Sequence, residues 1–381
     1  MFYKTFLGNK VSQMGMGLMR LPVIDDDNNK IDVKAAKEMV DYAYANGINY
    51  FDTAWGYHGG NSQKFIGEAL KEYPRESFYL TNKFPGYDLD NMPYAEEIFE
   101  KQLEYCQVDY FDYYLIHNVC EMNMEAYLDP KFGIKEYYKK QVENGRIKHL
   151  GFSLHGKIDV FNQFMEGYGD IMEFCQLQLN YLDWEFQEVN KTYEKCKELG
   201  IEVVAMEIVR GGSLCTLDDK YMEQLSKFRK DETAVTWAYR FLQSLDNVKV
   251  NLSGVSSLEQ LKENIKAFSE GEAANQEEFD ALVGIAKDMF EPGRVKCTKC
   301  KYCIPKCPMG LDIPFLLDLY NEHKFSVGGF IAPMALESLD ENKQPKDCIA
   351  CGACRQVCPQ GLKIPEYLED FDHILEIYDQ E

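Results

Sequence analysis

Apolar residues follow two alternating patterns along the first 268 residues of the chain. Short apolar runs, typical of buried strands, lie near 14–19, 48–52, 78–82, 112–116, 149–152, 173–177, 202–206 and 250–254. After each run the apolar positions recur with the period of an amphipathic helix, at 33–46, 62–72, 94–106, 134–143, 157–166, 187–199, 231–244 and 257–268. Gly47, Gly145 and Gly200 end three of these stretches, where a helix end favours glycine.

Eight strand–helix units in succession predict an α/β protein with a closed parallel (β/α)8 barrel, the TIM-barrel fold. An open doubly wound sheet is the alternative, and it requires a glycine-rich phosphate turn after the first strand. Gly15-Met16-Gly17 lacks the third glycine and leads into Leu21-Pro22 instead of a helix. The 381 residues can hold one barrel of roughly 250 residues and a smaller module. We therefore predict the barrel in residues 1–275.

Two cysteine-rich segments repeat each other in the last third of the chain. We expect a connector helix at 276–292 and a small, mainly helical domain at 293–381. Cys297, Cys300, Cys303 and Cys307 precede Pro308, and 51 positions later Cys348, Cys351, Cys354 and Cys358 precede Pro359. Between the repeats, Phe315–His323 has the pattern of a helix. The last residues, Glu366–Glu381, are expected to form an acidic amphipathic helix or a loose tail.

The cysteine spacing, C-x2-C-x2-C-x3-C-P twice over, is the spacing that binds [4Fe–4S] clusters. In two-cluster ferredoxins the fourth cysteine of each run binds the other cluster. By that logic one cluster takes Cys297, Cys300, Cys303 and Cys358, and the other takes Cys348, Cys351, Cys354 and Cys307. Two structural zinc sites are the alternative, but three consecutive C-x2 steps favour clusters. The segment resembles helical dicluster ferredoxin modules, in which C-P-x-G-x-x-I-P follows each quartet.

Four residues with proton-transfer chemistry follow three of the expected strands. Asp52 and Tyr57 come just after the run at 48–51, Lys83 ends the run at 78–82, and His117 follows the run at 113–116. The carboxyl ends of barrel strands are where barrel enzymes carry their catalytic residues. Each residue alone has a structural alternative, since a single histidine at a strand end is usually only hydrogen-bonded. Together they form a candidate proton-transfer site.

At this point residues 3–268 resemble the aldo/keto reductases, whose tetrad is Asp-Tyr-Lys-His in this order and setting. The pattern D-T-A-x-x-Y-x-x-x-x-S-x-x-x-x-G-x-A-L spans Asp52 to Leu70. The resemblance implies an oxidoreductase acting on a small carbonyl or alcohol. Tyr57 would donate the proton to the developing alkoxide, and the ammonium of Lys83 would lower the pKa of Tyr57 from its usual value near 10. Asp52 would hold Lys83, and His117 would orient the carbonyl oxygen or share the proton.

The same resemblance implies an NAD(P)H site along the later strand ends. Its implied contacts are Ser153, Gln176, Arg210, Gly211, Gly212, Ser213, Leu214, Gly254, Ser256, Gln260, Glu263 and Asn264. The sequence departs from the family in three ways. Met206 replaces the aromatic residue that usually stacks on the nicotinamide, Glu207 brings an acid near the ring, and the loop after Gly254 lacks a cation for a 2′-phosphate. NADH is therefore expected to bind at least as well as NADPH, and a bound flavin stays possible.

Composition narrows the classes of partner. A net charge of -22 argues against nucleic acid, which requires a basic surface. The chain has no apolar run of about 18 residues or more, and its first residues lack the layout of a signal peptide, so we expect a cytoplasmic protein without a membrane span. Of thirteen cysteines, five lie before residue 216 and eight in the two quartets. In a chain of this class that distribution favours metal over disulfides.

Three functions are compatible with these features. In the first, the barrel acts on a small carbonyl or alcohol substrate, and the clusters relay single electrons to or from a redox partner such as a ferredoxin or flavoprotein. In the second, the barrel is a nicotinamide-dependent reductase whose clusters only stabilise the C-terminal domain. In the third, the chain is a non-catalytic electron-transfer subunit of a larger complex. A complete tetrad argues against the third function, because a pure electron carrier does not need one. We favour the first.

Overall fold

A computed structural model of the protein describes residues 1–270, 272–290, 293–326, 329 and 331–378. The chain divides into two compact units, Met1–Ala286 and Lys287–Glu381, and each is described by itself. No helix among the described residues is long and apolar enough to cross a membrane.

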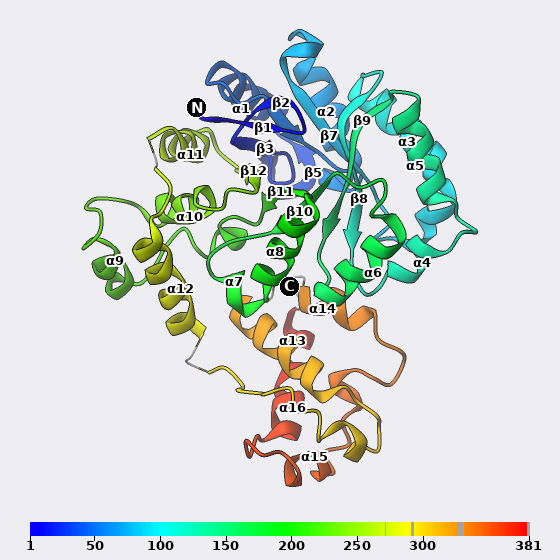
Figure 1. Ribbon diagram of the computed structural model, residues 1–381, viewed down its shortest axis with the longest axis vertical. Coiled ribbons are helices and arrows are strands. Elements are labelled where there is room, and N and C mark those ends of the chain that lie inside the picture. The colour runs from blue at the N-terminus through cyan, green and yellow to red at the C-terminus, as the bar shows by residue number, and fades with distance from the viewer. Residues whose placement is uncertain (271, 291–292, 327–328, 330, 379–381) are drawn as a thin grey trace. The chain divides into compact units, whose positions relative to one another are not determined.

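The first unit is a closed barrel of eight parallel strands surrounded by helices, which confirms the predicted fold (Figure 1). Around the barrel the strands follow their order in the chain, and the last one, β12, pairs with the first, β3. The strands are β3 (Met14–Gly17), β6 (Tyr50–Asp52), β7 (Tyr79–Phe84), β8 (Phe111–Val119), β9 (Ile147–Leu154), β10 (Phe174–Gln178), β11 (Glu202–Met206) and β12 (Val248–Gly254). Because all eight run parallel, their carboxyl ends meet at one mouth of the barrel.

Each predicted helix of the barrel is present within a few residues of its expected bounds. These helices are α1 (Val33–Ala45), α2 (Asn61–Leu70), α3 (Ala95–Cys106), α5 (Ile134–Glu143), α6 (Ile158–Tyr168), α8 (Val189–Leu199), α10 (Ala234–Gln243) and α11 (Leu258–Glu270). Short helices α4 (Met124–Leu128), α7 (Asp183–Phe186) and α9 (Asp219–Leu225) were not predicted. The Asp32 side chain caps α1 by accepting the Ala35 N–H at 3.0 Å. Gly200 ends α8 at φ 70°, which a residue without Cβ adopts at little cost.

The structure contains two antiparallel hairpins that were not predicted from the sequence. The first consists of β1 (Tyr3–Phe6) and β2 (Asn9–Ser12), and it buries Phe6 inside the barrel. Phe6 stacks on Tyr113 with ring centroids 4.6 Å apart and meets Phe174, the first residue of β10, edge-on. The hairpin thus fills the amino-terminal end of the barrel. The second hairpin consists of β4 (Val23–Ile24) and β5 (Asp27–Ile31).

Most of the segment that was expected to be a connector belongs to the barrel unit. Helix α12 (Gln276–Phe290) places Phe279 in a stack on Phe241, with centroids 4.8 Å apart, and edge-on to Trp184. Its Glu278 carboxylate pairs with the Arg229 guanidinium at 2.6 Å. Residues 291 and 292, at the end of the expected connector, lie outside the described residues.

The second unit is mainly helical, and its sequence repeat is also a structural repeat. It contains α13 (Ile313–Ser326), α14 (Ile331–Glu337), α15 (Ala353–Gln356), α16 (Ile364–Tyr378) and the 3-10 turns η5 (Ile304–Lys306) and η6 (Pro345–Asp347). Helices α13 and α16 begin 51 positions apart and pack against each other. Positive φ angles also repeat at this offset, at Lys299 and Ala350, Lys301 and Gly352, and Gly310 and Gly361. The last expected residues of the tail, 379–381, lie outside the described part.

Candidate active site and cluster sites

Lys83 is the centre of the candidate catalytic site at the barrel mouth. Its Nζ donates hydrogen bonds to Oδ1 of Asp52 at 2.5 Å, to the Thr53 carbonyl at 2.9 Å and to the Tyr57 hydroxyl at 3.3 Å. The Lys83 side chain is fully buried and that of Asp52 is 3% exposed. The ammonium is therefore held out of bulk water by three oxygen atoms. One of these is the hydroxyl that would donate the proton.

The imidazole of His117 faces the phenol ring of Tyr57. The Tyr57 and His117 rings meet edge to face with centroids 6.4 Å apart. Nδ1 of His117 is buried and has no hydrogen-bond partner among the described residues. The structure therefore brings Asp52, Tyr57, Lys83 and His117 together, from the ends of β6 and β7, the turn after β6, and β8.

The local charges keep Lys83 as an ammonium. Burial opposes its charge, but the Asp52 carboxylate and the Tyr57 hydroxyl outweigh burial and raise its pKa. Burial raises the pKa of Asp52, while Lys83 acts in the opposite direction. The charge of each member of this pair therefore depends on the presence of the other.

The pKa of Tyr57 shifts in the direction opposite to that expected from the sequence. Lys83 lowers this pKa as expected, but burial raises it more, and the carboxylates of Asp52 and Glu207 add to the rise. Tyr57 thus keeps its proton at neutral pH. Burial and the charge of Lys83 hold the pKa of His117 well below its usual value, so its imidazole is neutral. Tyr57 is consequently the better proton donor of the two.

Two further residues at the mouth were missed by the sequence analysis. Tyr87 follows β7, and its ring lies 5.3 Å from that of His117, centroid to centroid. Burial, with Tyr57 and Asp88 adding, raises the pKa of Tyr87 to about 12. His155 follows β9 directly, and burial together with Lys83 lowers its pKa to about 4. Both residues stand just past a strand end, which is the same signal that identified His117, so the signal was present in the sequence.

Two of the implied nicotinamide contacts lie on neighbouring strands. Gln176 on β10 points its Nε2 at the Met206 sulfur, 3.4 Å away, and its buried Oε1 has no partner among the described residues. Buried amide oxygens normally accept a hydrogen bond. The N–H donors of a carboxamide group would supply the hydrogen bond that Oε1 of Gln176 lacks among the described residues. Ser153 on β9 instead uses its Oγ to accept the Asn118 N–H at 2.7 Å.

The loop after β11 contains five of the implied contacts. The buried Arg210 guanidinium is paired with Asp183, with Nε 3.0 Å from Oδ1, so this pairing orders the loop. Gly211 and Gly212 are exposed and have φ angles of 62° and 102°. The Ser213 hydroxyl donates to the Arg210 carbonyl at 2.8 Å, and Leu214 is buried. In this loop, backbone groups of the glycines are more accessible to a phosphate than the Arg210 side chain is.

The remaining implied contacts gather between the end of β12 and the start of α11. Gln260 accepts the Ser256 N–H at 2.9 Å, and Asn264 donates to the Ser253 hydroxyl at the same distance. Gly254 and Glu263 are exposed nearby. Because β9, β10, β11 and β12 are neighbours in the barrel, the implied contacts on these strands and on the loops after β11 and β12 follow one side of the barrel.

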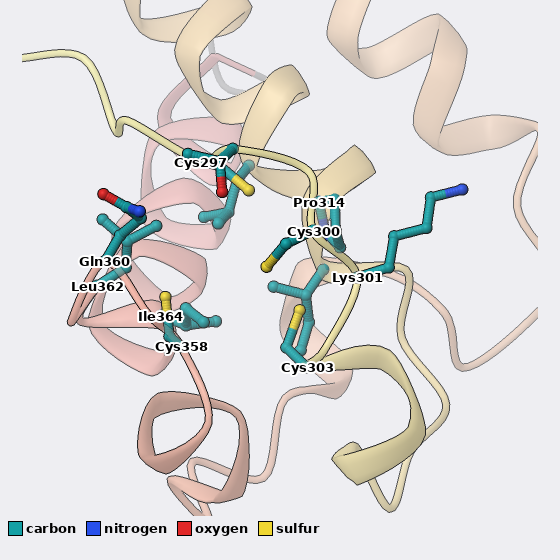
Figure 2. A pocket seen from close by; sticks show the side chains of 12 residues that line it. Cys297, Cys300, Lys301, Cys303, Pro314, Cys358, Gln360, Leu362 and Ile364 are labelled. Atoms are coloured by element: carbon teal, nitrogen blue, oxygen red, sulfur yellow. The ribbon is translucent and has the colours of Figure 1, made fainter.

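The eight cysteines of the second unit line two pockets, four in each. Cys297, Cys300, Cys303 and Cys358 line the first, and Figure 2 shows their sulfur atoms pointing into a shared space. Cys307, Cys348, Cys351 and Cys354 line the second. Each pocket thus combines three cysteines of one run with the fourth of the other run, the grouping that the crossed assignment requires, while binding of a cluster by these thiols stays a prediction.

The chemistry of these pockets fits an iron–sulfur cluster. Apolar side chains, including Ile313, Leu317 and Ile364, form much of the rest of the first pocket. Burial raises the pKa of Cys303 to about 11, and the neighbouring thiols of Cys297 and Cys300 contribute in the same direction. Four thiolates this close repel one another unless a positively charged group neutralises them. Iron supplies such a charge.

Comparison with known proteins assigns both units. Residues 13–287 match the Aldo/keto reductase family, and residues 296–362 match the 4Fe-4S dicluster domain. The chain belongs to the aldo/keto reductase family. It is therefore an oxidoreductase, and it combines the barrel of this family with an iron–sulfur dicluster domain.

Individual relatives of this aldo/keto reductase are distant. A probable aldo-keto reductase 1 of Glycine max is 28% identical over 208 residues, which cover 52% of this chain and 56% of the relative. The NADH-specific methylglyoxal reductase of Escherichia coli is 24% identical over 302 residues, 68% of this chain and 90% of that protein. The holo structure of aldo-keto reductase AKR11C1 from Bacillus halodurans superposes with a TM-score of 0.60 at 23% identity, covering 73% of this chain and 93% of its own. The last likeness concerns the fold alone.

Proposed function

We propose that this aldo/keto reductase interconverts a small carbonyl compound and its alcohol, with Tyr57 as the proton donor to the carbonyl oxygen. The observation that carries the proposal is the position of Lys83, whose ammonium contacts both the Asp52 carboxylate and the Tyr57 hydroxyl. Reduction creates an alkoxide that needs a proton, and a positioned tyrosine can deliver it. A non-catalytic electron-transfer subunit would not need this arrangement.

Each residue of the tetrad has a distinct role in the proposed reaction. Tyr57 holds its proton until negative charge develops on the substrate oxygen. Lys83 then stabilises the tyrosinate that remains, and Asp52 keeps Lys83 charged and in place. His117, being neutral, contributes orientation of the carbonyl oxygen instead of a second acid. A nicotinamide, when bound, would supply the hydride in this family's chemistry, and Gln176 would hold its carboxamide.

We propose that NADH serves this barrel at least as well as NADPH. The loop from Gly254 to Ser257 contains no cation, and Glu259 adds a negative charge beside it. The nearest lysine in the following helix, Lys262, holds its ammonium over the Tyr42 ring, 5.4 Å from the centroid. The relative from Escherichia coli is NADH-specific by name. Titration of both nucleotides, followed by fluorescence, tests this proposal, and a strong preference for NADPH would refute it.

We propose further that the two clusters relay single electrons between the barrel and a redox partner, a ferredoxin or a flavoprotein. The presence of two complete cysteine quartets supports this role, because two clusters can pass electrons from one to the other. A hydride carries two electrons at once, whereas each cluster carries one. The relay therefore requires either a flavin at the barrel mouth or a substrate that accepts electrons one at a time.

Anaerobic purification followed by iron, sulfide and cofactor analysis tests these proposals together. We expect about eight iron atoms per chain, from two four-iron clusters. We also expect nicotinamide-dependent reduction of small aldehydes or ketoaldehydes, with methylglyoxal as the first substrate to be tried. Extraction shows directly whether a flavin is present. Zinc in place of iron would refute the cluster assignment. Absence of any carbonyl turnover with either nucleotide or with a reduced electron carrier would refute the proposed reaction.

A further inference from the structure

The loop after β11 holds one of its own carboxylates on its backbone. Oε2 of Glu207 accepts the N–H of Gly211 at 2.7 Å. The Glu207 carbonyl in turn accepts the Arg210 N–H at 2.9 Å and an Asn180 amide N–H at 3.0 Å. Glu207, Arg210 and Gly211 all have φ angles in the left-handed region, between 47° and 62°. Backbone amides in such turns commonly bind anions. Here the anion is a side chain of the loop itself.

A cation from another loop comes close to the same glycine. Arg20 follows β3, and its side chain runs past Gly254 at the end of β12, with Cγ and Cδ 3.6 Å from the position that a Cβ would take there. Its Nη2 lies 3.6 Å from the corresponding position on Gly211, where Oε2 of Glu207 lies 3.9 Å away. Arg20 is exposed, and within the described part of the chain it makes no hydrogen bond or ion pair.

We propose that the Arg20 guanidinium and the Gly211 N–H form a binding site for a phosphate group of the nucleotide, and that the Glu207 carboxylate occupies this site until the nucleotide displaces it. The inference rests on the proposed binding of a nicotinamide nucleotide by the barrel. The cation of this site comes from the loop after β3, and the phosphate in question is one of the diphosphate, which NADH and NADPH share.

The chemistry of the groups supports this assignment. A carboxylate oxygen and a phosphate oxygen compete for the same N–H, and two anions on one amide would repel each other. The planar guanidinium of arginine matches two phosphate oxygens at once. Two other cations nearby are already engaged, since Arg210 is paired with Asp183 and Lys262 lies over Tyr42. Arg20 therefore has the freedom to turn toward a ligand.

Calorimetric titration of the anaerobic holoprotein with NADH and with ADP tests the proposal. ADP carries the diphosphate and the adenosine without the nicotinamide, so it reports on the phosphate site independently of the nicotinamide contacts. Arg20→Gln should weaken both ligands by about 10-fold, the usual effect of losing one charge-assisted hydrogen bond. Glu207→Gln should tighten both by a similar factor, about 10-fold, because the competing charge is gone. Arg20→Lys should fall between wild type and Arg20→Gln.

Matched controls lie on α8, where Lys195 pairs with Glu198 at 3.0 Å on the surface. Lys195→Gln and Glu198→Gln make the same charge changes and should leave both affinities unchanged. Circular dichroism and the cluster absorbance verify that each variant is folded and loaded.

The outcomes separate this inference from the proposed function. Equal affinities for wild type, Arg20→Gln and Glu207→Gln would overturn the phosphate site while leaving nicotinamide binding intact. Binding of ADP with the expected variant effects, but no binding of NADH or NADPH, would leave the site standing and refute nicotinamide as the cofactor. If wild type bound none of these ligands, both would be overturned.

Discussion

Lys83 donates a hydrogen bond of 3.3 Å to the hydroxyl of Tyr57; the Lys83 side chain is fully buried and the Tyr57 side chain is partly buried. Burial makes the tyrosinate costly to form, while the adjacent ammonium makes it less costly. The resting state is therefore a protonated tyrosine beside a cation that stabilises its conjugate base as soon as the proton leaves. This relationship is the basis of the predictions on proton transfer below.

Replacing Tyr57 with Phe removes the proton donor without changing the shape of the site. Turnover of a carbonyl substrate should fall on the order of 10²–10⁴-fold, the usual loss for a positioned acid. The fold and the affinity for the nucleotide should stay as in wild type, because no hydrogen bond to the nucleotide is assigned to Tyr57. Steady-state kinetics and a nucleotide titration of the same preparation measure both. Turnover of Tyr57→Phe at the wild-type rate would disprove the role of the tetrad.

Replacing Lys83 with Met should destabilise the barrel, because it leaves the buried Asp52 carboxylate without its counterion. Breaking one partner of a buried ion pair costs about 3–5 kcal/mol. The urea midpoint of the unfolding transition, followed by circular dichroism, should therefore drop clearly.

The matched control for this stability effect is the double variant Lys83→Met with Asp52→Asn. Its midpoint should recover part of the loss, since the uncompensated charge has been removed. A single variant with an unchanged midpoint, or a double variant less stable than the single one, would show that the buried charge is not the cause.

The pH dependence of carbonyl reduction should follow Tyr57. A proton donor is active below its pKa, and the pKa of Tyr57 is raised above its ordinary value, so kcat should decline only above about pH 10. His117 has a pKa well below its ordinary value and stays neutral, so the profile should be flat through about pH 6.5. A limb near that pH which disappears in His117→Gln would mean that His117, not Tyr57, supplies the proton.

Each pocket contains three cysteines of one run and the fourth cysteine of the other run. This arrangement predicts which cysteine variants lose the same cluster. Cys358→Ser should lose the same cluster as Cys297→Ser, because both thiols line the first pocket. Cys307→Ser should match Cys348→Ser, because both line the second. Iron analysis and the electron paramagnetic resonance spectrum of the reduced protein identify the remaining cluster in each variant. If Cys358→Ser left the same signal as Cys348→Ser, each run of cysteines would bind its own cluster.

Periodicity and spacing were enough to predict the barrel and to expect Asp52, Tyr57, Lys83 and His117 at one mouth of it. Alternation of apolar strands and amphipathic helices is a local signal, and the positions just past strand ends meet in space because parallel strands share one mouth. In the second unit the cysteine spacing predicted the grouping of the thiols, whereas the packing of α13 against α16 was not predicted.

Features that depend on distant contacts could not be predicted in this way. The strand Asp27–Ile31 is mostly polar and carries no apolar alternation, so β5 was not recognised. The direction of the Tyr57 pKa shift depends on burial, which the sequence does not give. Arg20 lies after the first barrel strand but reaches a loop more than 180 residues later, and only the closure of the barrel between β12 and β3 brings the two together.

The most direct test of the account is a single turnover without nicotinamide. The anaerobic protein is freed of nucleotide, its clusters are chemically reduced, excess reductant is removed, and a carbonyl compound is added while the cluster absorbance is followed. We predict that the clusters are reoxidised as the alcohol forms, and that Tyr57→Phe slows this step on the order of 10²–10⁴-fold. Clusters that stay reduced beside a carbonyl compound that the same preparation reduces with NADH would contradict the relay and assign the clusters a purely structural role.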